Sequence, residues 1–253
     1  MNDKPELSVV IPTYNEKENI EILIPSLEDA LQEQGIAAEI IIVDDNSPDK
    51  TGEAAKKLNE TYNNIVVVVR TEEKGIASAW FHGYDIARGK YIATIDADLC
   101  HRPEDLVRMY RELPGYDIVI GSRYIEQGSG MTGKSRVHIL ASKVAQYVIK
   151  FFIGINETDM THSFRIFKRG VFQSIKNDLN TSGNVFLVMF LHLAVKKGYT
   201  IKEVPITYGK RKYGETKLNV YSESARFMGT AVRIYLNNIF GKREKRANQP
   251  KGE

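Results

Sequence analysis

The sequence predicts an α/β fold with a mostly parallel central sheet flanked by helices. Strand-like and helix-like segments alternate through the first 122 residues. The strand-like segments are continuous apolar runs such as LSVVIP and EIIIV, which indicates burial on both faces and helices on both sides of the sheet. With 253 residues, 42% of them hydrophobic, the chain is long enough for one large domain of this class.

Each predicted element has its own local signal. We expect strands at Leu7–Pro12, Glu39–Val43, Ile65–Arg70, Tyr91–Ile95 and Asp117–Ser122. We expect helices at Glu18–Gln34, Pro48–Tyr62, Ile76–Arg88 and Pro103–Leu113. Gly35 and Gly89 follow two of the helices, and Pro103 stands in the first turn of another, where proline is favoured.

The bulk composition excludes several classes of protein. A net charge of +3 gives no reason to expect a nucleic-acid partner. The single cysteine, Cys100, excludes an internal disulfide framework and fits a reducing compartment. The charged start MNDKPE predicts no secretory signal, and no apolar run reaches the roughly 18–20 residues that span a bilayer. We therefore expect a protein that is soluble or peripheral to a membrane.

Polar or charged residues follow every predicted strand. The clusters are Pro12–Glu16, Asp44–Ser47, Arg70 with Lys74 and Gly75, Asp96–Asp98, and Gly121–Tyr124. One such cluster is also typical of a helix cap. Five of them at one edge favour a binding site, because ligands of open α/β sheets bind beyond the carboxyl ends of the strands.

The strongest local signal is Asp96-Ala97-Asp98. Two carboxylates at a strand end repel each other, which is costly in a cleft unless a cation compensates. Oxygen ligands suit Mg²⁺ or Mn²⁺, and Mg²⁺ typically binds one or two carboxylates together with substrate phosphates. The alternative is a cap for the helix that begins near Pro103, which explains only one aspartate.

Glycine-rich phosphate fingerprints do not explain the predicted site. No Gly-x-Gly-x-x-Gly turn follows the first strand, which argues against a dinucleotide dehydrogenase. The glycine-rich run Gly128–Gly133 is interpreted as a loop, because no strand immediately precedes it.

Six segments resemble those of glycosyltransferase family 2. They are VVIPTYNE, IIVDDNSPD, EKGIASAW, IDADLCHRPEDL, GSRY and RKYGETKL, and they extend from about Ser8 to Leu218. Within the family they are most similar to dolichyl- and polyprenyl-phosphate mannose synthases. The resemblance implies a GT-A nucleotide-sugar-binding fold. It also implies transfer of mannose from GDP-mannose to dolichyl or polyprenyl phosphate, with Mg²⁺ or Mn²⁺ as cofactor.

The resemblance also implies roles for individual residues. Positions that hold the nucleoside are Pro12, Tyr14, Glu16, Val43 and Asp45. Positions that hold the donor diphosphate are Asp96, Ala97, Asp98, Arg211 and Lys217. Asp98 matches the main metal ligand and Cys100 a second metal position, while Arg123 and Arg136 match contacts to the acceptor phosphate. Asp98, Arg123, Arg211 and Lys217 are the expected catalytic residues.

The chemistry of the acceptor fits an inverting displacement. A phosphate monoester is already an anion at neutral pH, with a second pKa near ~6, so it needs little help from a general base. Arginine presents forked donors to phosphate oxygens and reduces the repulsion between the acceptor and the donor diphosphate. We therefore expect in-line attack without a covalent sugar–enzyme intermediate.

Three segments depart from the family pattern. Cys100 stands where many members have Gln and others Ser, and a thiol suits softer metals than Mg²⁺. Thr161–Arg165 reads THSFR where TSGFR is usual, so His162 is either a phosphate contact or a loop histidine without a special role. Phe186–Met189 reads FLVM where Phe-Gln-x-Glu is usual.

These departures keep two alternative functions open. The first is the same reaction with UDP-glucose or another nucleotide sugar as donor. The second is a weakly active nucleotide-sugar-binding subunit of a membrane complex, which Cys100, Leu187 and Met189 suggest. The intact Asp96-Ala97-Asp98 segment and the basic Arg211 and Lys217 argue against the second.

Two amphipathic segments fit either helices that cover the domain core or helices that contact a membrane or a partner, and for Ser222–Phe240 we favour contact with a membrane or a partner. In Ser222–Phe240, polar residues form a narrow stripe beside a wide apolar face, and a basic segment follows, which suits an interfacial helix on anionic lipid. The stripe comprises Glu223, Arg226, Thr230, Arg233 and Asn237. Ser135–Ile153 has a similar pattern, with Gln146 and Lys150 on its polar side, and fits a core helix or a membrane helix equally well.

We expect three parts in the chain. They are a glycosyltransferase domain at 1–218, an amphipathic interfacial helix at 219–241 and a basic polar tail at 242–253. The expected location is cytoplasmic, peripheral on the cytoplasmic face of a membrane. By analogy with family members of this length, a separate small membrane subunit is an expected partner.

Overall fold

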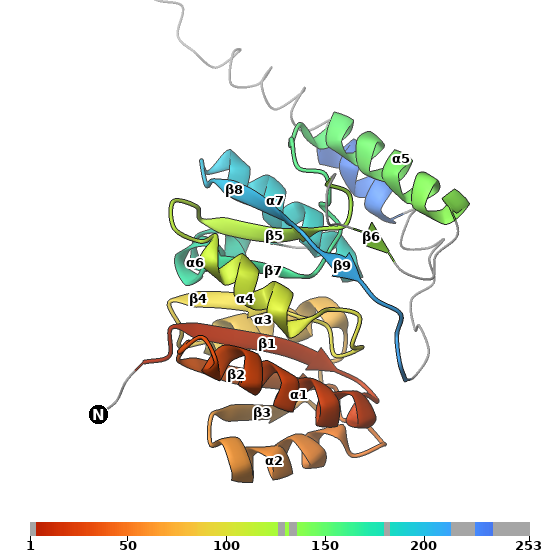
Figure 1. Ribbon diagram of the computed structural model, residues 1–253. Coiled ribbons are helices and arrows are strands. Elements are labelled where there is room, and N and C mark those ends of the chain that lie inside the picture. The colour runs from red at the N-terminus through yellow and green to blue at the C-terminus, as the bar shows by residue number, and fades with distance from the viewer. Residues whose placement is uncertain (1–3, 126–129, 132–135, 180–182, 214–225, 235–253) are drawn as a thin grey trace, which may run out of the picture.

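Seven strands form the central sheet of the computed structural model, in the order β3-β2-β1-β4-β7-β5-β8 (Figure 1). The structure describes residues 4–125, 130–131, 136–179, 183–213 and 226–234. The first elements are β1 (Leu7–Thr13), α1 (Lys17–Gln32), β2 (Ala38–Asp44), α2 (Thr51–Tyr62), β3 (Ile65–Val69), α3 (Ile76–Ile86), β4 (Tyr91–Thr94), α4 (Pro103–Arg111) and β5 (Ile118–Ser122). The five predicted strands are therefore confirmed to within one residue at each end.

The second half of the chain adds elements that the sequence pattern did not predict. They are β6 (Gly130–Met131), β7 (Arg165–Lys168), α6 (Arg169–Ile175), α7 (Phe186–Lys196), β8 (Ile201–Pro205) and β9 (Thr207–Tyr208). Strand β7 lies antiparallel between β4 and β5, whereas the other pairs in the sheet are parallel. Arg165 pairs with Thr94 of β4 and Ile120 of β5, so β7 begins at the edge where those strands end.

Two apolar cores cover the two faces of the sheet. Successive residues of β2 alternate between them: Ile41 and Val43 join one core, and Ile40 and Ile42 join the other. This double burial explains why the strand is a continuous apolar run. Helices α1, α2 and α4 pack on one face, and α3, α6 and α7 pack on the other (Figure 1).

Two helices extend the core that contains α3, α6 and α7 beyond the sheet. The predicted helix at Ser135–Ile153 is confirmed as α5 (Arg136–Ile153), and residues 226–234 form the described part of the predicted helix at Ser222–Phe240. Ile149 and Ile153 of α5 share a core with Ala231 and Ile234. Among the described residues, no helix is long and apolar enough to cross a membrane.

The predicted polar sides of these two helices are wrong at two positions. Gln146 and Thr230 are buried. The Gln146 side chain donates to Thr161 Oγ1 at 2.7 Å and accepts from the Met160 N–H at 3.2 Å, so its polar group is satisfied inside the protein. Because both sides of each helix carry apolar residues, the sequence pattern did not identify the inward side.

Candidate active site

The polar clusters that follow the strands lie together at one edge of the sheet. Parallel pairing of β1 with β2 and β4, and of β5 with β8, brings their carboxyl ends to this edge. The chain after β9 passes along the same side (Figure 1). The predicted convergence of these clusters is therefore confirmed.

Asp44 has a structural function at the end of β2. Its carboxylate accepts hydrogen bonds from Thr13 Oγ1 at 3.0 Å and from the Ser47 N–H at 2.9 Å. The Ser47 hydroxyl is a further donor. These contacts close the turn after β2. They do not cap α2, because the residue before that helix is Lys50 and no side chain caps it, so the capping alternative for this cluster is wrong.

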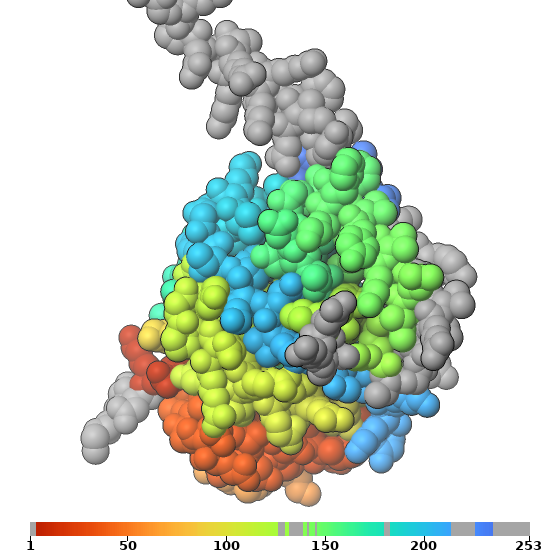
Figure 2. Space-filling model, turned by 45° about the horizontal axis from the view of Figure 1, so that its top comes forward, coloured from red at the N-terminus to blue at the C-terminus, as the bar shows by residue number. Residues whose placement is uncertain are grey.

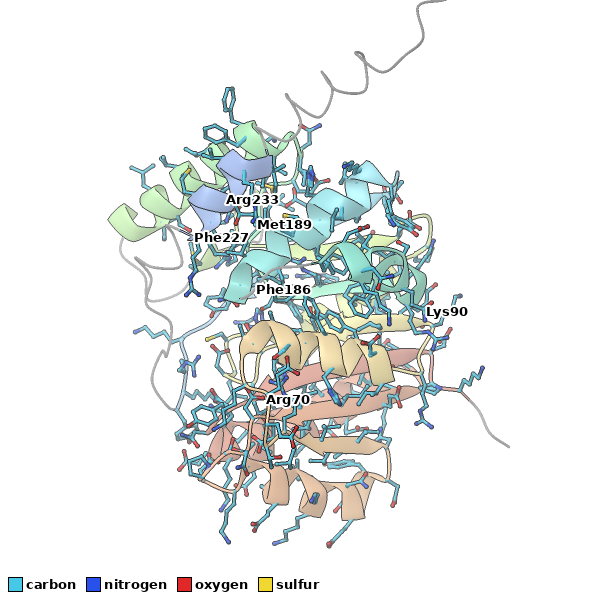
Figure 3. The ribbon with its side chains drawn as sticks, turned by 180° about the vertical axis from the view of Figure 1, so that it is seen from behind. Arg70, Lys90, Phe186, Met189, Phe227 and Arg233 are labelled. Atoms are coloured by element: carbon cyan, nitrogen blue, oxygen red, sulfur yellow. The ribbon has the colours of Figure 1, made fainter. Side chains whose placement is uncertain are left out.

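Asp45 forms a buried ion pair with Arg70. Arg70 donates its Nε–H to Asp45 Oδ1 at 2.7 Å, and its Nη2 forms a second contact to the same oxygen. The Gly75 N–H donates to Asp45 Oδ2 at 2.8 Å, and Arg70 Nη1 donates to Ser78 Oγ at 2.9 Å. Arg70, labelled in Figure 3, thus joins the ends of β2 and β3 to the first turn of α3.

Four other residues assigned to the donor differ in exposure. Pro12, Val43 and Ala97 are buried, and Val43 and Ala97 lie in the cores. Tyr14 is 39% exposed and lies at the rim of the site.

Arg211 bridges the two acidic residues Glu16 and Asp98. Its Nη1 lies 3.1 Å from Glu16 Oε1 and its Nη2 lies 3.1 Å from Asp98 Oδ2. Burial alone lowers the pKa of Arg211, but Asp98 and Glu16 outweigh it and raise the pKa above its ordinary value. The guanidinium therefore serves as the counterion of both carboxylates.

The segment that carries Arg211 is fixed to the site at two further points. The Gly209 N–H donates to the Cys100 carbonyl at 2.8 Å, and the Asn19 side-chain amide lies 3.5 Å from the Tyr213 carbonyl oxygen. Residues 209–213 thus cross from the segment after β4 to the start of α1. Lys217, the next expected basic residue, lies outside the described residues, as does the side chain of Arg136 at the start of α5.

Asp96 and Asp98 do not cap α4. The residue before that helix is Arg102, and no side chain caps it. Instead Asp96 accepts from Ser163 Oγ at 2.6 Å and lies 3.6 Å from His101 Nε2. Burial alone raises the pKa of Asp96, but His101, Ser163 and the charge of Arg211 hold it below its ordinary value, so this carboxyl is ionised at neutral pH. The capping alternative for this pair is therefore wrong.

Cys100 contacts the Asp98 carboxylate through its backbone N–H, and its sulfur is uncharged. Its N–H donates to Asp98 Oδ1 at 3.1 Å. Burial, reinforced by Asp98, raises the pKa of the buried thiol to about 12, so the sulfur is protonated at neutral pH. A protonated sulfur is a poor nucleophile.

The oxygen donors at this edge fit a hard divalent cation. Asp98 and Asp96 are carboxylates, and the described part of the chain has no group of three or more His, Cys, Asp or Glu side chains that form a metal cage. The two carboxylates are compatible with Mg²⁺, which typically binds one or two carboxylates together with substrate phosphates and water.

Arg123 lies at the end of β5 in a bidentate ion pair with Asp159. Its Nε lies 2.7 Å from Asp159 Oδ2 and its Nη2 lies 2.8 Å from Asp159 Oδ1. Burial alone lowers the pKa of Arg123, but Asp159 outweighs it and raises the pKa above its ordinary value. Sequence reasoning did not identify Asp159, because 36 residues separate the two partners and no motif marks the second.

His162 and Arg165 are both buried. The Nδ1 of His162 lies 3.2 Å from the Gly121 carbonyl oxygen. Burial, together with Arg123, lowers the pKa of His162 well below its ordinary value, so at neutral pH the imidazole is uncharged and is not a cationic phosphate contact. Arg165 donates to the carbonyls of Leu187 and His162, and no carboxylate of a described residue forms an ion pair with it.

The departure at Phe186–Met189 changes packing. Phe186 and Leu187, in the first turn of α7, are buried in the core that α7 shares with α3, and Met189 packs against the same core. Figure 3 shows Met189 on α7 near Phe227 of the helix at 226–234. Apolar residues here suit the interface between these two helices.

The glycine-rich run after β5 includes the letter pattern of a phosphate-binding P-loop, GSGMTGKS at Gly128–Ser135. Its described residues, Gly130–Met131, form β6, which pairs in parallel with β9. The Gly130 N–H donates to the Ile206 carbonyl at 3.1 Å and is therefore not free for a phosphate. The strand-like geometry of these two residues differs from a phosphate loop.

Comparison with known sequences gives a consistent family. The family model described as glycosyl transferase family 2 matches residues 8–176. The chain is 35% identical to the dolichol-phosphate mannosyltransferase of Pyrococcus furiosus over 93% of this chain and 63% of that protein. It is 32% identical to the polyprenol monophosphomannose synthase of Mycolicibacterium smegmatis over 83% of this chain and 80% of that protein. It thus spans less than two thirds of the length of the archaeal relative.

Solved structures show the same fold. Glucosyl-3-phosphoglycerate synthase from Mycobacterium tuberculosis, in complex with Mn²⁺, uridine diphosphate and phosphoglyceric acid, matches with a TM-score of 0.65 and 18% identity over 90% of this chain and 77% of that chain. A mannosyltransferase from Pyrobaculum calidifontis, in complex with GDP-Man and Mn²⁺, matches with a TM-score of 0.60 and 18% identity over 92% of this chain and 65% of that chain. The fold is therefore GT-A, and the match over residues 8–176 shows that this chain belongs to glycosyl transferase family 2.

Proposed function

We propose that this protein is an inverting glycosyltransferase that moves mannose from GDP-mannose to dolichyl or another polyprenyl phosphate. The observation that carries the proposal is the grouping of Asp98, Arg211 and Arg123 at one edge of the sheet. The chain that holds them is 32–35% identical to two enzymes named for polyprenol- or dolichol-phosphate mannose synthesis. The grouping supplies carboxylates for a metal-bound donor and cations for two phosphates.

The donor would lie across the ends of β1, β2 and β4. The resemblance assigns Asp45 and Glu16 to the nucleoside, and in the structure Asp45 is paired with Arg70 and Glu16 with Arg211. Asp98, with Asp96 beside it, would hold Mg²⁺ or Mn²⁺, and such an ion neutralises charge on the departing diphosphate when bound. Arg211 already contacts Asp98, which leaves it close to the diphosphate position. The role of Lys217 follows from the resemblance alone.

The acceptor phosphate would approach from the side of Arg123. Arg136, at the start of α5, is its expected second cationic contact. The two arginines would offset the repulsion between the acceptor and donor phosphates. No protein carboxylate is required as a base, because the attacking oxygen belongs to a phosphate that is already ionised. One displacement at the anomeric carbon inverts its configuration.

The outer side of α5 is the proposed contact with the membrane that carries the acceptor. Leu140, Val144, Tyr147 and Phe151 recur at helical spacing and are 63%, 53%, 71% and 73% exposed. Figure 2 shows α5, in green, on the outside of the molecule. Met228 and Val232 of the neighbouring helix are also exposed. Large exposed apolar groups in such a row are typical of an interfacial helix.

This surface completes the proposed arrangement of the chain. A transferase domain at 1–218 would lie on the cytoplasmic face of a membrane through α5 and the interfacial helix at 219–241. The basic tail at 242–253, which lies outside the described residues, would add attraction to anionic lipid. A separate small membrane subunit remains an expected partner by family analogy.

The membrane contact predicts that two aromatic substitutions release the protein from lipid. Replacing Tyr147 and Phe151 together with Ser is expected to weaken binding to vesicles of mixed neutral and anionic lipid by about tenfold or more, because apolar burial is lost. Vesicle co-sedimentation measures the change. Ile22→Ser, at an exposed apolar position on α1, is the matched control. Equal binding by all three proteins would exclude this face of α5 as the lipid contact.

The donor is tested by thermal unfolding with GDP-mannose, UDP-glucose and UDP-N-acetylglucosamine, each with and without Mn²⁺. A ligand at a hundredfold excess over its dissociation constant stabilises the folded state by about 2.7 kcal/mol. For a chain of this size that is a shift of several degrees, roughly 2–4 °C per kcal/mol. We expect a metal-dependent shift with GDP-mannose and transfer of labelled mannose to dolichyl phosphate. A shift with a UDP-sugar alone would assign another hexose. Donor binding without transfer would favour the binding-subunit alternative.

A further inference from the structure

Asp159 contacts Arg123 through three hydrogen bonds. Besides the bidentate contact to the guanidinium, Asp159 Oδ2 accepts the backbone N–H of Arg123 at 3.1 Å. The Asp159 side chain is 0% exposed and that of Arg123 is 15% exposed, so little water competes for these bonds. The carboxylate therefore fixes both the backbone and the side chain of the arginine.

The corner that carries Asp159 is itself fixed by Glu203 of β8. Glu203 Oε1 accepts from the Thr158 N–H at 2.9 Å, from Thr158 Oγ1 at 2.8 Å and from the Asp159 N–H at 3.2 Å. Ser122 Oγ at the end of β5 lies 2.7 Å from Thr158 Oγ1. Because β5 and β8 are paired, this network ties Asp159 to the same strand ends that carry Arg123.

The remaining surroundings of Arg123 leave part of the guanidinium for another partner. The Cζ atom of Arg123 lies 5.2 Å from the centre of the Tyr124 ring and 5.7 Å from the centre of the Tyr208 ring. These two rings restrict the plane of the guanidinium. The bidentate contact with Asp159 uses Nε and Nη2, and none of the described residues forms a hydrogen bond with the two Nη1–H donors. The guanidinium is thus oriented on one side and has donors on another.

A buried carboxylate beside a phosphate contact needs a physical explanation. Its negative charge repels an approaching phosphate, so it weakens binding unless it provides something else. Asp159 is also a poor general base, because its two oxygens accept three hydrogen bonds from Arg123. The compensating gain is geometry, since catalytic groups act only when they are held in the productive orientation.

We propose that Asp159, supported by Glu203, is a positioning residue that orients Arg123 toward the phosphate of the acceptor. This inference rests on the proposed function, and specifically on Arg123 as a contact of the acceptor phosphate. It implies that Asp159 affects the acceptor through Arg123 and leaves the donor site unchanged.

Steady-state kinetics with separate titration of donor and acceptor tests the inference on the full chain. We expect Asp159→Asn to raise the KM for polyprenyl phosphate about tenfold or more and to leave the KM for the donor within about twofold of wild type. In an Arg123→Ala background, Asp159→Asn should have no further effect on the acceptor KM. A purely structural role would lower activity in both backgrounds.

Substitutions of Glu203 give a second measurement that leaves the Asp159 carboxylate in place. Glu203→Gln keeps an Oε1 acceptor and should retain a nearly normal acceptor KM, whereas Glu203→Ala should raise it. Asp117→Asn is the matched control. Asp117 binds Lys168 and Thr200 at the other end of β5 and β8, where the loss of an ion pair should not change the acceptor KM.

The outcomes separate the inference from the proposed function. If Arg123→Ala leaves the acceptor KM unchanged, the assignment of Arg123 is wrong and the inference is overturned with it. If Arg123→Ala raises the acceptor KM but Asp159→Asn and Glu203→Ala do not, only the positioning role is overturned. If Asp159→Asn does not fold, the contrast between Glu203→Gln and Glu203→Ala decides the question.

Discussion

Replacing Asp98 with Asn is expected to reduce sugar transfer by about 10²- to 10³-fold and to weaken Mn²⁺ binding in the same protein. A reduction of about 10²- to 10³-fold is typical when an enzyme loses one group that stabilises the charge that develops in the transition state. Asp98 is nearly buried, and its Oδ2 lies 3.1 Å from Arg211, so the carboxylate is already balanced against a cation. The amide of Asn has no net charge to balance a divalent ion.

Two measurements separate the effects of Asp98→Asn. Initial rates with saturating donor and acceptor report transfer, and Mn²⁺ titration followed by electron paramagnetic resonance reports metal affinity with GDP present. Asp85→Asn is the control, because Asp85 pairs with Lys176 on the surface away from the site. Normal turnover of Asp98→Asn would remove Asp98 from the metal site. Lost turnover with normal Mn²⁺ affinity would instead confine Asp98 to the pairing with Arg211.

The first half of the fold was predictable because its signals are local. Strands β1 and β2 are apolar runs of the length that a doubly covered sheet requires, and each is followed by a polar turn. Strand β7 is only four residues long and includes two charged residues, and β8 reads IKEVP, with polar residues inside the strand. Neither resembles a doubly buried run. Their positions depend on pairing with distant strands.

The candidate site was predictable to the extent that it follows strand ends. Asp45, Asp98 and Glu16 lie in the segments that follow β2, β4 and β1, so the topology alone places them at one edge. The partners that orient these residues come from elsewhere: Arg211 is 113 residues from Asp98, and Ser163 is 67 residues from Asp96. Such pairings depend on the path of loops, which has no periodic signal in the sequence.

Amphipathic pattern alone did not identify the outer side of α5. Its inner side holds Ile149 and Ile153 together with the hydrogen-bonded Gln146, while its outer side holds Tyr147 and Phe151. A rule that directs apolar residues inward and polar residues outward therefore reverses three of these five positions. A helix between a protein core and a proposed lipid surface has two apolar environments, so the usual contrast between its sides is lost.

Replacing Arg211 with Ala is expected to change transfer and metal binding in opposite directions. Loss of a cationic donor beside the diphosphate should lower kcat/KM by about 10²- to 10³-fold. Mn²⁺ affinity without donor should rise by about tenfold, because the guanidinium no longer occupies Asp98 Oδ2 or adds positive charge nearby. Arg211→Lys keeps the charge but cannot bridge Glu16 and Asp98 with one forked group. Its kcat/KM and its Mn²⁺ affinity should therefore lie between those of the wild type and of Arg211→Ala.

The opposite signs make Arg211→Ala a test of charge exchange at Asp98. A variant that is merely destabilised loses metal affinity and activity together. If the Arg211 guanidinium competes with the ion for Asp98, its removal raises the metal affinity and lowers the activity. Isothermal titration with Mn²⁺ alone and with Mn²⁺ plus GDP measures both states of the site. Lys212→Ala is the matched control, because Lys212 is the exposed neighbour of Arg211 in the same segment. If donor-free Mn²⁺ affinity is the same in wild type and Arg211→Ala, the guanidinium does not compete with the ion, and its contribution is limited to binding the diphosphate.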